Sequence, residues 1–436
     1  MASSIASQID GPNVSGSFRP APAPGPTQKT YQPSLLMQAW IVIIMIMPVC
    51  GTFYPPETYF GSFGPENQIE AILPYPITPA LLVLFSLTSA YLFARMWQVQ
   101  KIKHEPMAYL YFAVAMASCA WSFDPQVTFL RALRLLPLIT LGVIFAQLLP
   151  LKQMLRLLVI AYLVSSILSI LVSVAMPSLG QSVNMVGEYS TAWRGGTSHK
   201  NSAGYTYGIG LILAVFATFF GVNWRLTALT GLTCLVMIVM SKSSTGLLGT
   251  FAALAACGIF AISWRFPRGV GPLLAVTLLL LVAAGTMATV SAPILLETVT
   301  GRDLSMTGRT DIWEAVEAQI VRQPITGYGY SFWQADSPVR AEIWRTVRYT
   351  PPHAHNSWLD LLLQVGVFGL ITVAFVSLRG TIVALIKASS QSLAGLMGFG
   401  ILVLVLSRSF TEVQFSEPGT AGVFWLVWAS VVARRA

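Results

Sequence analysis

The chain has 436 residues, of which 55% are hydrophobic and 10% are charged. Charged residues make up roughly a quarter of an ordinary soluble domain, so this composition and a mean hydropathy of +0.67 exclude a water-soluble enzyme and indicate a membrane protein. The net charge of +9 is no argument for nucleic-acid binding, because the basic excess lies in connections that face one side of the bilayer.

The chain divides into four parts. Residues 1–33 are rich in Pro, Ala, Gly and Ser and predict a disordered cytoplasmic tail, not a signal peptide. Residues 34–290 contain nine apolar stretches, residues 291–358 form one long polar segment, and residues 359–436 add three more spans. The expected fold is an all-α polytopic membrane protein with about twelve transmembrane helices. We expect these at 35–53, 77–97, 107–123, 129–149, 155–176, 203–221, 226–241, 246–263, 270–290, 359–378, 393–409 and 420–433.

The basic residues predict the orientation of these spans. With a cytoplasmic N-terminus, the inner connections and the tail hold fourteen Lys and Arg residues and two acidic ones. This is the bias that the positive-inside rule describes. The long segment 291–358 and the connection around 193–204 then lie on the outer side, and a polar segment of such length between apolar spans is usually functional.

The long segment contains a helix signal near Thr307. Asp311 is expected to cap the helix and Glu314 to reach back to its start, while Pro324 ends it. Between them an apolar stripe predicts an amphipathic helix on the outer membrane surface or on the bundle: Ile312, Trp313, Val316 and Ile320. Arg309 lies just before this helix, where backbone N–H groups attract anions.

Two histidines, His353 and His355, stand where the segment returns to the membrane. A metal site is disfavoured, because no Cys and no well-placed carboxylate completes one. A general base or hydrogen-bonding group is the alternative, since neutral imidazole suits that role near neutral pH. For His353 a loop histidine without a role is an equal alternative.

A second polar patch carries Arg194, His199, Lys200 and Asn201 at the start of a span. Such a patch suits a lipid-linked phosphate, which Arg contacts through two nitrogens and Lys through a point charge. Arg131 and Arg134 lie one helical turn apart near the outer end of the fourth span, which is costly without an anionic partner. For Arg131, extension toward lipid head groups is an equal alternative.

Four motifs follow one another in these outer segments. They are Arg194-Gly195 with His199 and Asn201, then Thr307-Gly308-Arg309 with Trp313, then Pro324 with Gly327 and Gly329, and finally His355-Asn356 with Leu359, Gly366 and Gly369. In this order they resemble the superfamily of O-antigen ligases and Wzy-type polysaccharide polymerases, by motif over roughly residues 190–375. The 193–201 string looks closest to the ExoQ-like exopolysaccharide polymerases, although Gly195-Gly196-Thr197 departs from the bulkier apolar residue expected near position 196.

The resemblance implies a GT-C-type glycosyltransferase of the bacterial inner membrane with its active site facing the periplasm. Such enzymes transfer a glycan from undecaprenyl pyrophosphate to an acceptor hydroxyl with inversion, without a cofactor or metal. Arg194 and Arg309 match the functional arginines and His355 the essential loop histidine. Expected partners are the lipid-linked oligosaccharide donor, the glycan acceptor, the bilayer and proteins of polysaccharide export and chain-length control, and no nucleic acid.

The expected catalytic residues are therefore His355, Arg309 and Arg194. The expected substrate-binding residues are His199, Lys200, Asn201, Arg134, Asn356, Gly327 and Gly329. Three alternatives stay open: an O-antigen ligase that uses lipid A core as acceptor, a polysaccharide-linked membrane transporter, and a non-catalytic scaffold of an export complex. A transporter would be expected to carry ionisable residues near mid-membrane and paired broken helices, which this sequence does not show.

Overall fold

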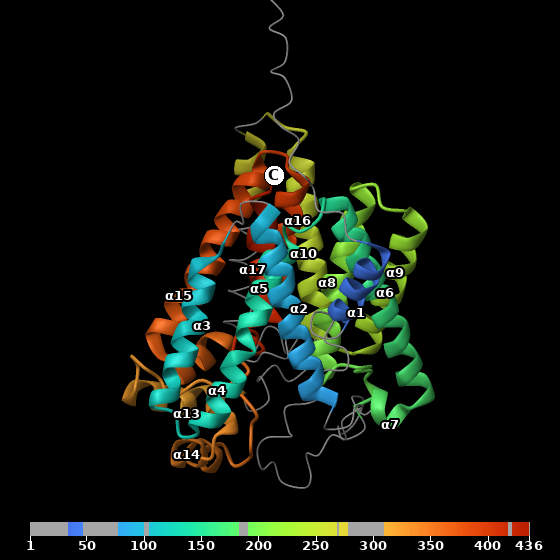
Figure 1. Cartoon of the computed structure of the whole chain (residues 1–436). Helices are drawn as coiled ribbons and strands as arrows, with labels where there is room; N and C mark the ends of the chain where they lie inside the picture. Colours follow the sequence, from blue (N-terminus) through green and yellow to red (C-terminus); the bar gives the residue numbers. More distant parts are fainter. Residues whose placement is uncertain are drawn as a thin grey trace, which may run out of the picture.

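The computed structural model describes residues 34–46, 77–99, 104–182, 191–267, 270–277, 309–416 and 421–435. Within these ranges the chain consists of helices and connecting turns, with no strand. Figure 1 shows the long helices side by side as one bundle, with α13 and α14 together at one end. The expectations for residues 1–33 and for 278–308 lie outside the described residues.

Five stretches of helix are long and apolar enough to cross a membrane. They are α4–α5 (Pro125–Leu133 and Leu135–Phe145), α6 (Leu151–Ala175), α8 (Lys200–Phe219), α10 (Ser244–Ser263) and α15 (Ser357–Ser389). Shorter apolar helices are α1 (Leu35–Ile46), α3 (Pro106–Ala117, continued by η3 to Ala120), α9 (Trp224–Met240), α16 (Leu393–Ser409) and α17 (Gly422–Ala433), and α2 covers Ile77–Val99. Each predicted span overlaps a described helix, the first only at residues 35–46 and the ninth only at residues 270–277. A multi-pass all-α membrane fold is confirmed, and the count of twelve stays a prediction.

Helix α17 lies in the centre of the bundle. Every residue from Gly422 to Ala433 is buried, and the helix packs on α5, α15 and α16. A helix that is apolar on all sides belongs in such a position. Residues 410–416, which follow α16, lie against the start of α15, which matters for the site.

Helix α15 bends at Gly366, whose φ of +63° is the left-handed conformation that favours glycine. The turn at 324–329 lies against this bend. The backbone N–H groups of Tyr328 and Gly329 donate to the carbonyl oxygens of Leu363 and Gln364, both at 2.8 Å. A side chain at Gly327 would collide with the backbone of Gln364, so the paired glycines are needed for close packing of this turn.

The polar segment before α15 forms two helices, α13 (Arg309–Arg322) and α14 (Pro338–Val347), which pack on each other and, through α13, on α15. The predicted amphipathic helix is confirmed, since Ile312 and Val316 are buried while Glu314 and Glu317 are exposed. The expected cap is wrong. The helix begins at Arg309, so Asp311 lies within its first turn.

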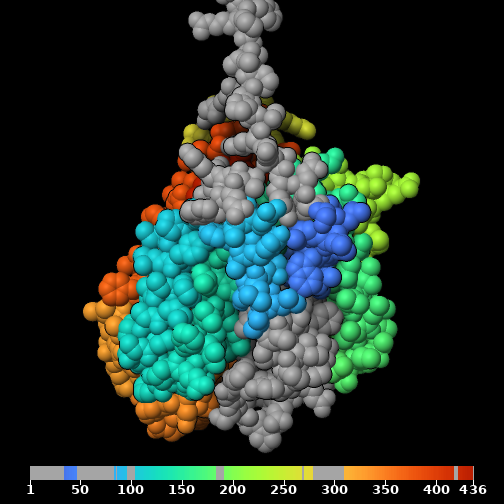
Figure 2. All heavy atoms as spheres, viewed as in Figure 1, coloured from blue at the N-terminus to red at the C-terminus, as the bar shows by residue number. Residues whose placement is uncertain are grey.

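Helix α14 is an element that the sequence analysis did not predict. It holds part of the basic stretch 340–348, and Ser337 caps it by accepting from the N–H of Arg340. The Arg340 guanidinium is buried over the ring of Trp344, at 4.3 Å from its centroid. In the space-filling view, the surface of α3 and α4 continues onto these outer helices at the bottom of the molecule (Figure 2).

The opposite end of the bundle holds an ion cluster around Glu105, which is 2% exposed. Arg379 of α15 donates to its Oε2 at 2.9 Å, and Arg434, which follows α17, donates to its Oε1. Burial raises the pKa of Glu105, against the charges and hydrogen bonds of these two arginines. The carboxylate and the two guanidinium groups tie three helices together.

Candidate active site

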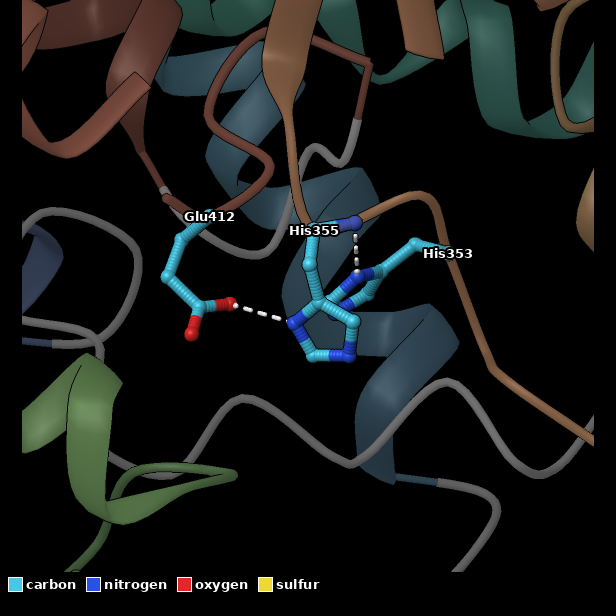
Figure 3. Close-up of side chains that lie close together, drawn as sticks. All are labelled: His353, His355 and Glu412. Atoms are coloured by element: carbon cyan, nitrogen blue, oxygen red, sulfur yellow. Dashed lines mark hydrogen bonds and ion pairs between the residues drawn. The ribbon is translucent and has the colours of Figure 1, made fainter. Parts of the chain in front are cut away.

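The site is built around Glu412, in the connection between α16 and α17. The residue is 5% exposed. Its Oε1 accepts hydrogen bonds from Asn201 Nδ2 at 2.7 Å and Arg309 Nη2 at 3.0 Å. Its Oε2 lies 3.2 Å from His355 Nδ1, as Figure 3 shows. One carboxylate thus joins the starts of α8 and α13 and the loop before α15, segments that lie far apart in the sequence.

Glu412 is ionised near neutral pH. Burial raises its pKa, but the hydrogen bond from His355 and the electrostatic interactions with His355, His353 and Arg408 outweigh that effect and hold the pKa well below its ordinary value. The ion pair with Arg309 adds a charge-assisted bond to a side chain that is only 21% exposed. The site therefore holds a fixed negative charge among several cations.

His355 occupies a constrained backbone position. Its φ of +50° is left-handed, which is uncommon for a residue with a side chain and is found where surrounding contacts impose it. Its N–H donates to His353 Nδ1 at 3.2 Å, and the next residue, Asn356, caps α15 by accepting from the N–H groups of Trp358 and Leu359. The expectation that the following helix anchors His355 is consistent with this geometry.

His353 lies against His355, with ring centroids 4.1 Å apart. Burial, followed by the charge of His355, lowers the pKa of His353 to about 3. Its ring is therefore neutral, as the hydrogen bond that its Nδ1 accepts from the His355 N–H requires. His353 therefore has a structural role, since it accepts a hydrogen bond from the backbone of His355. A role in catalysis is not tested by this contact.

The start of α8 enters the site from another side. His199 caps the helix by accepting from the Asn201 N–H at 3.2 Å, and Ser243 Oγ donates to Asn201 Oδ1 at 3.0 Å. That bond orients the amide so that its nitrogen faces Glu412. Burial lowers the pKa of His199 to about 4, against the charge of Glu412, so this ring too is neutral. Lys200 Nζ lies 3.5 Å from the carbonyl oxygen of Lys242.

Arg194 is held by its backbone at the edge of this segment. Its N–H donates to the carbonyl oxygen of Gly180 at 2.8 Å, and the Gly196 N–H donates to Ser169 Oγ at 3.1 Å. Gly195 has a φ of +56°, and a side chain there would meet Ser169 Oγ at 2.6 Å, so this position requires glycine. Burial lowers the pKa of Arg194, whose Nε has no hydrogen-bond partner among the described residues.

Three of the expected site residues lie elsewhere. Arg134 stands at the break between α4 and α5, where its buried Nε has no hydrogen-bond partner within the part of the chain that the structure describes. Gly327 and Gly329 lie in the turn against α15, where they allow close packing. Their assignment to substrate binding stays a prediction.

Glu412 and Arg408 were not predicted from the sequence as site residues. Arg408, in the last turn of α16, is 4% exposed, lies 4.3 Å from the Tyr205 ring centroid and donates to Ser202 Oγ at 3.3 Å. Its Nε and Nη1 have no hydrogen-bond partner in the described ranges. The available signal was a basic and an acidic residue four positions apart at the end of an apolar span.

A carboxylate does complete a possible metal site. His353, His355 and Glu412 each offer a ligand atom, all within 4.8 Å of one another, so the argument that no well-placed carboxylate stands near the histidine pair is wrong. The surroundings oppose a divalent cation, however. Both oxygens of Glu412 are engaged, and the guanidinium charges of Arg309 and Arg408 act on the same carboxylate. The arrangement suits a histidine paired with a carboxylate.

The bundle and this cluster define a multi-pass membrane protein with a buried, cation-rich polar site at one end. Residues 229–374 match the family described as O-antigen ligase. Over 257 residues the chain is 26% identical to the "Exopolysaccharide production protein ExoQ" of Rhizobium meliloti (strain 1021), which covers 56% of this chain and 58% of that protein. The resemblance predicted from the motifs is confirmed. The chain aligns with less than two thirds of the relative, and the family match includes Arg309 and His355 but not Arg194, Asn201 or Glu412.

Proposed function

We propose that the protein is a membrane glycosyltransferase that transfers an undecaprenyl-pyrophosphate-linked glycan to an acceptor hydroxyl and thereby polymerises exopolysaccharide repeat units. The observation that carries the proposal is the buried Glu412 carboxylate bonded to His355, Arg309 and Asn201 at one end of a multi-pass bundle. The similarity to an O-antigen ligase family and to ExoQ supports it. We further propose a GT-C-type fold, a periplasmic active site in the inner membrane, inversion at the sugar, and no metal or cofactor.

His355 is the proposed general base. If its Nδ1–H donates to Glu412 Oε2, Nε2 remains free to accept the proton of the attacking hydroxyl. The acceptor oxygen forms a bond to the anomeric carbon, the bond from that carbon to the pyrophosphate oxygen breaks, and the pyrophosphate leaves with the electron pair. Glu412 stabilises the imidazolium that forms, and a single displacement inverts the configuration.

The cations around Glu412 are the proposed binding site for the leaving group. Negative charge grows on the pyrophosphate oxygen as the bond breaks, so fixed guanidinium groups stabilise the transition state more than the ground state. Arg309 and Arg194 form this clamp. Arg408 supports it because its buried guanidinium keeps two nitrogens without a hydrogen-bond partner in the described structure, and a charge near the membrane needs an anionic partner. Lys200 and Arg134 are further supporting residues.

Analysis of the glycans made by a strain that lacks this protein tests the proposal. A polymerase deletion should abolish long chains while single repeat units accumulate on undecaprenyl pyrophosphate at the outer face. Repeat units held at the inner face would indicate a transporter instead. Purified protein that elongates a lipid-linked repeat unit would exclude a non-catalytic scaffold.

A ligase is the second candidate, since the matching family is described as O-antigen ligase. The same deletion distinguishes it from a polymerase. Full-length chains that remain on the lipid carrier, with none attached to the lipid A core, would show that ligation is the missing step. Normal long chains on their usual acceptor would contradict both candidates.

A further inference from the structure

Asp360, in the first turn of α15, is a buried acidic residue that the proposed mechanism does not use. It is fully buried, and an acidic side chain in a membrane helix is costly unless it has partners. Its partners are complete. Oδ1 accepts from Trp333 Nε1 at 2.7 Å and from the Ala354 N–H at 3.2 Å, while Oδ2 accepts from Gln364 Nε2 at 2.6 Å and from Ser416 Oγ.

Two of these four partners belong to the loops that carry the site. Ala354 lies between His353 and His355, so the bond to its N–H fixes the peptide next to the proposed base. Ser416 ends the described part of the loop that carries Glu412. One carboxylate is thus bonded on Oδ1 to the histidine loop and on Oδ2 to the glutamate loop.

The same helix turn holds the glutamate loop at a second point. Ser357 Oγ donates to the carbonyl oxygen of Glu412 at 2.8 Å and accepts from the Gln414 N–H at 2.8 Å. Ser357 and Asp360 are three residues apart and therefore lie on one side of the helix. The described part of this loop is thus held against α15 at Glu412, Gln414 and Ser416, and α15 begins two residues after His355.

We infer that Asp360 is a positioning residue that sets the approach of His355 to Glu412. The inference rests on the proposed function for its kinetic consequence but not for its geometry. Catalytic groups must be held to within about half an ångström, and such precision requires supporting hydrogen bonds. With a hydrogen-bonding contact of 3.2 Å between His355 Nδ1 and Glu412 Oε2, a small displacement of either loop would break it.

The hydrogen bond between Asp360 and Gln364 can be reversed by exchanging the amide and the carboxylate between the two positions. In Asp360→Asn, the new amide nitrogen would face the amide nitrogen of Gln364, and Gln364 cannot rotate freely because its Oε1 accepts from the Ser331 N–H at 2.7 Å. In Asp360→Asn with Gln364→Glu, the new asparagine amide donates to the new carboxylate. That carboxylate also accepts from the Ser331 N–H, as Gln364 does in the native protein. The double variant keeps the charge and the number of hydrogen bonds while it exchanges the two side chains.

The kinetic test uses purified full-length protein in nanodiscs with a lipid-linked repeat unit. We expect Asp360→Asn to lower kcat at least tenfold while KM for the donor changes less than twofold, and the double variant to recover most of kcat. Asp124→Asn is the control. It makes the same chemical change at the N-cap of α4, where Asp124 accepts from the Val127 N–H and contacts no group of the site. A kcat in Asp360→Asn equal to that of the control would overturn the inference.

A second measurement is independent of turnover. Thermal unfolding of His355→Ala, Glu412→Gln and the combined variant gives the coupling between these two residues by a double-mutant cycle. We expect coupling in the native background, none in Asp360→Asn and its return in the exchanged pair. Coupling that persists in Asp360→Asn would refute the positioning role. If the native protein shows coupling but transfers no glycan, the proposed function alone fails.

Discussion

The two ends of the bundle each bury a glutamate among arginines, and they treat it differently. Glu105 has two guanidinium partners, and burial is the dominant influence that raises its pKa. Glu412 shares its oxygens among an arginine, an asparagine and a histidine, and its pKa falls well below the ordinary value. Both oxygens of Glu105 pair with guanidinium groups, while Glu412 pairs with one guanidinium group, one amide and one imidazole ring.

The distance between the clusters follows from α15, which reaches both. Arg379 lies 22 residues after Ser357, or roughly 33 Å along a helix, about the thickness of the hydrocarbon core. A structural ion cluster on one side and a polar site on the other is the arrangement expected of an enzyme that works on one membrane face. The comparison therefore depends on which end faces outward.

Cysteine labelling should give an all-or-none answer to that question. Thr350 follows α14 and Gln391 follows α15, and both are exposed at opposite ends of the bundle. We expect a membrane-impermeant thiol reagent to label Thr350→Cys in intact cells above the background of native cysteines, and to label Gln391→Cys only after permeabilisation. Labelling in the reverse order would place the site in the cytoplasm and exclude a periplasmic reaction.

Substitution of the two glutamates compares the ends directly. Glu412→Gln removes the charge that pairs with Arg309 and orients His355, so we expect turnover to fall on the order of 10²-fold or more. Glu105→Gln is the matched control and should weaken thermal stability while turnover per inserted molecule is preserved. Equal losses of turnover would show that both clusters are merely structural.

The histidine pair sharpens the comparison within the site. His355→Ala should cost on the order of 10²-fold in turnover, since it removes the proposed base, whereas His353→Ala should cost far less. Assays on purified protein with the lipid-linked donor and with EDTA present would measure both. Equal losses that added zinc restores would mean that His353, His355 and Glu412 bind a metal.

The guanidinium groups can be compared in the same way. Arg309→Lys keeps a charge but loses the planar fork that contacts two phosphate oxygens, so we expect a loss of tenfold or more in turnover. Arg379→Lys at the Glu105 cluster is the control and should leave turnover unchanged. Full activity of Arg309→Lys in a protein that inserts normally would contradict the proposed clamp.

The positions of the helices could be predicted from the sequence because membrane spans are local patterns of about twenty apolar residues. Helix α13 was also predicted from a local pattern, because Ile312 and Val316 lie at helical spacing and form its buried face. The break at Arg134 and the bend at Gly366 were not predicted, since each depends on what packs against the helix.

The site could be predicted only where its residues formed motifs. Arg309, His355, His199 and Asn201 come together as expected, but the acidic residue that joins them lies more than fifty positions after His355 in a short connection. No local pattern identifies a contact formed by such a fold-dependent return of the chain. Arg408 was missed for the same reason, because only the structure shows that its guanidinium is buried.

The smallest effect we expect concerns pH. The folded-state pKa of His353 is about 3, below the unfolded value near 6.5, so between these values the unfolded chain binds a proton that the folded protein does not. The contribution of the neutral His353 ring to the free energy of unfolding is therefore complete above about pH 6.5 and is lost as the pH falls toward 3. The His353 ring is partly exposed, and we expect its contribution to the free energy of unfolding to be less than the ~1.4 kcal/mol per pH unit of a fully buried group.

Thermal unfolding of His353→Gln in nanodiscs should show a smaller drop in melting temperature from pH 6.5 to 5 than the native protein. The pKa of Glu412 is lowered, so the stabilisation that its carboxylate provides is lost only as the pH falls below about 4.5. Glu412 should therefore not contribute between pH 6.5 and 5. An unchanged slope in His353→Gln would mean that the ring already takes up a proton in the folded state, and the bond from the His355 N–H would then need another account.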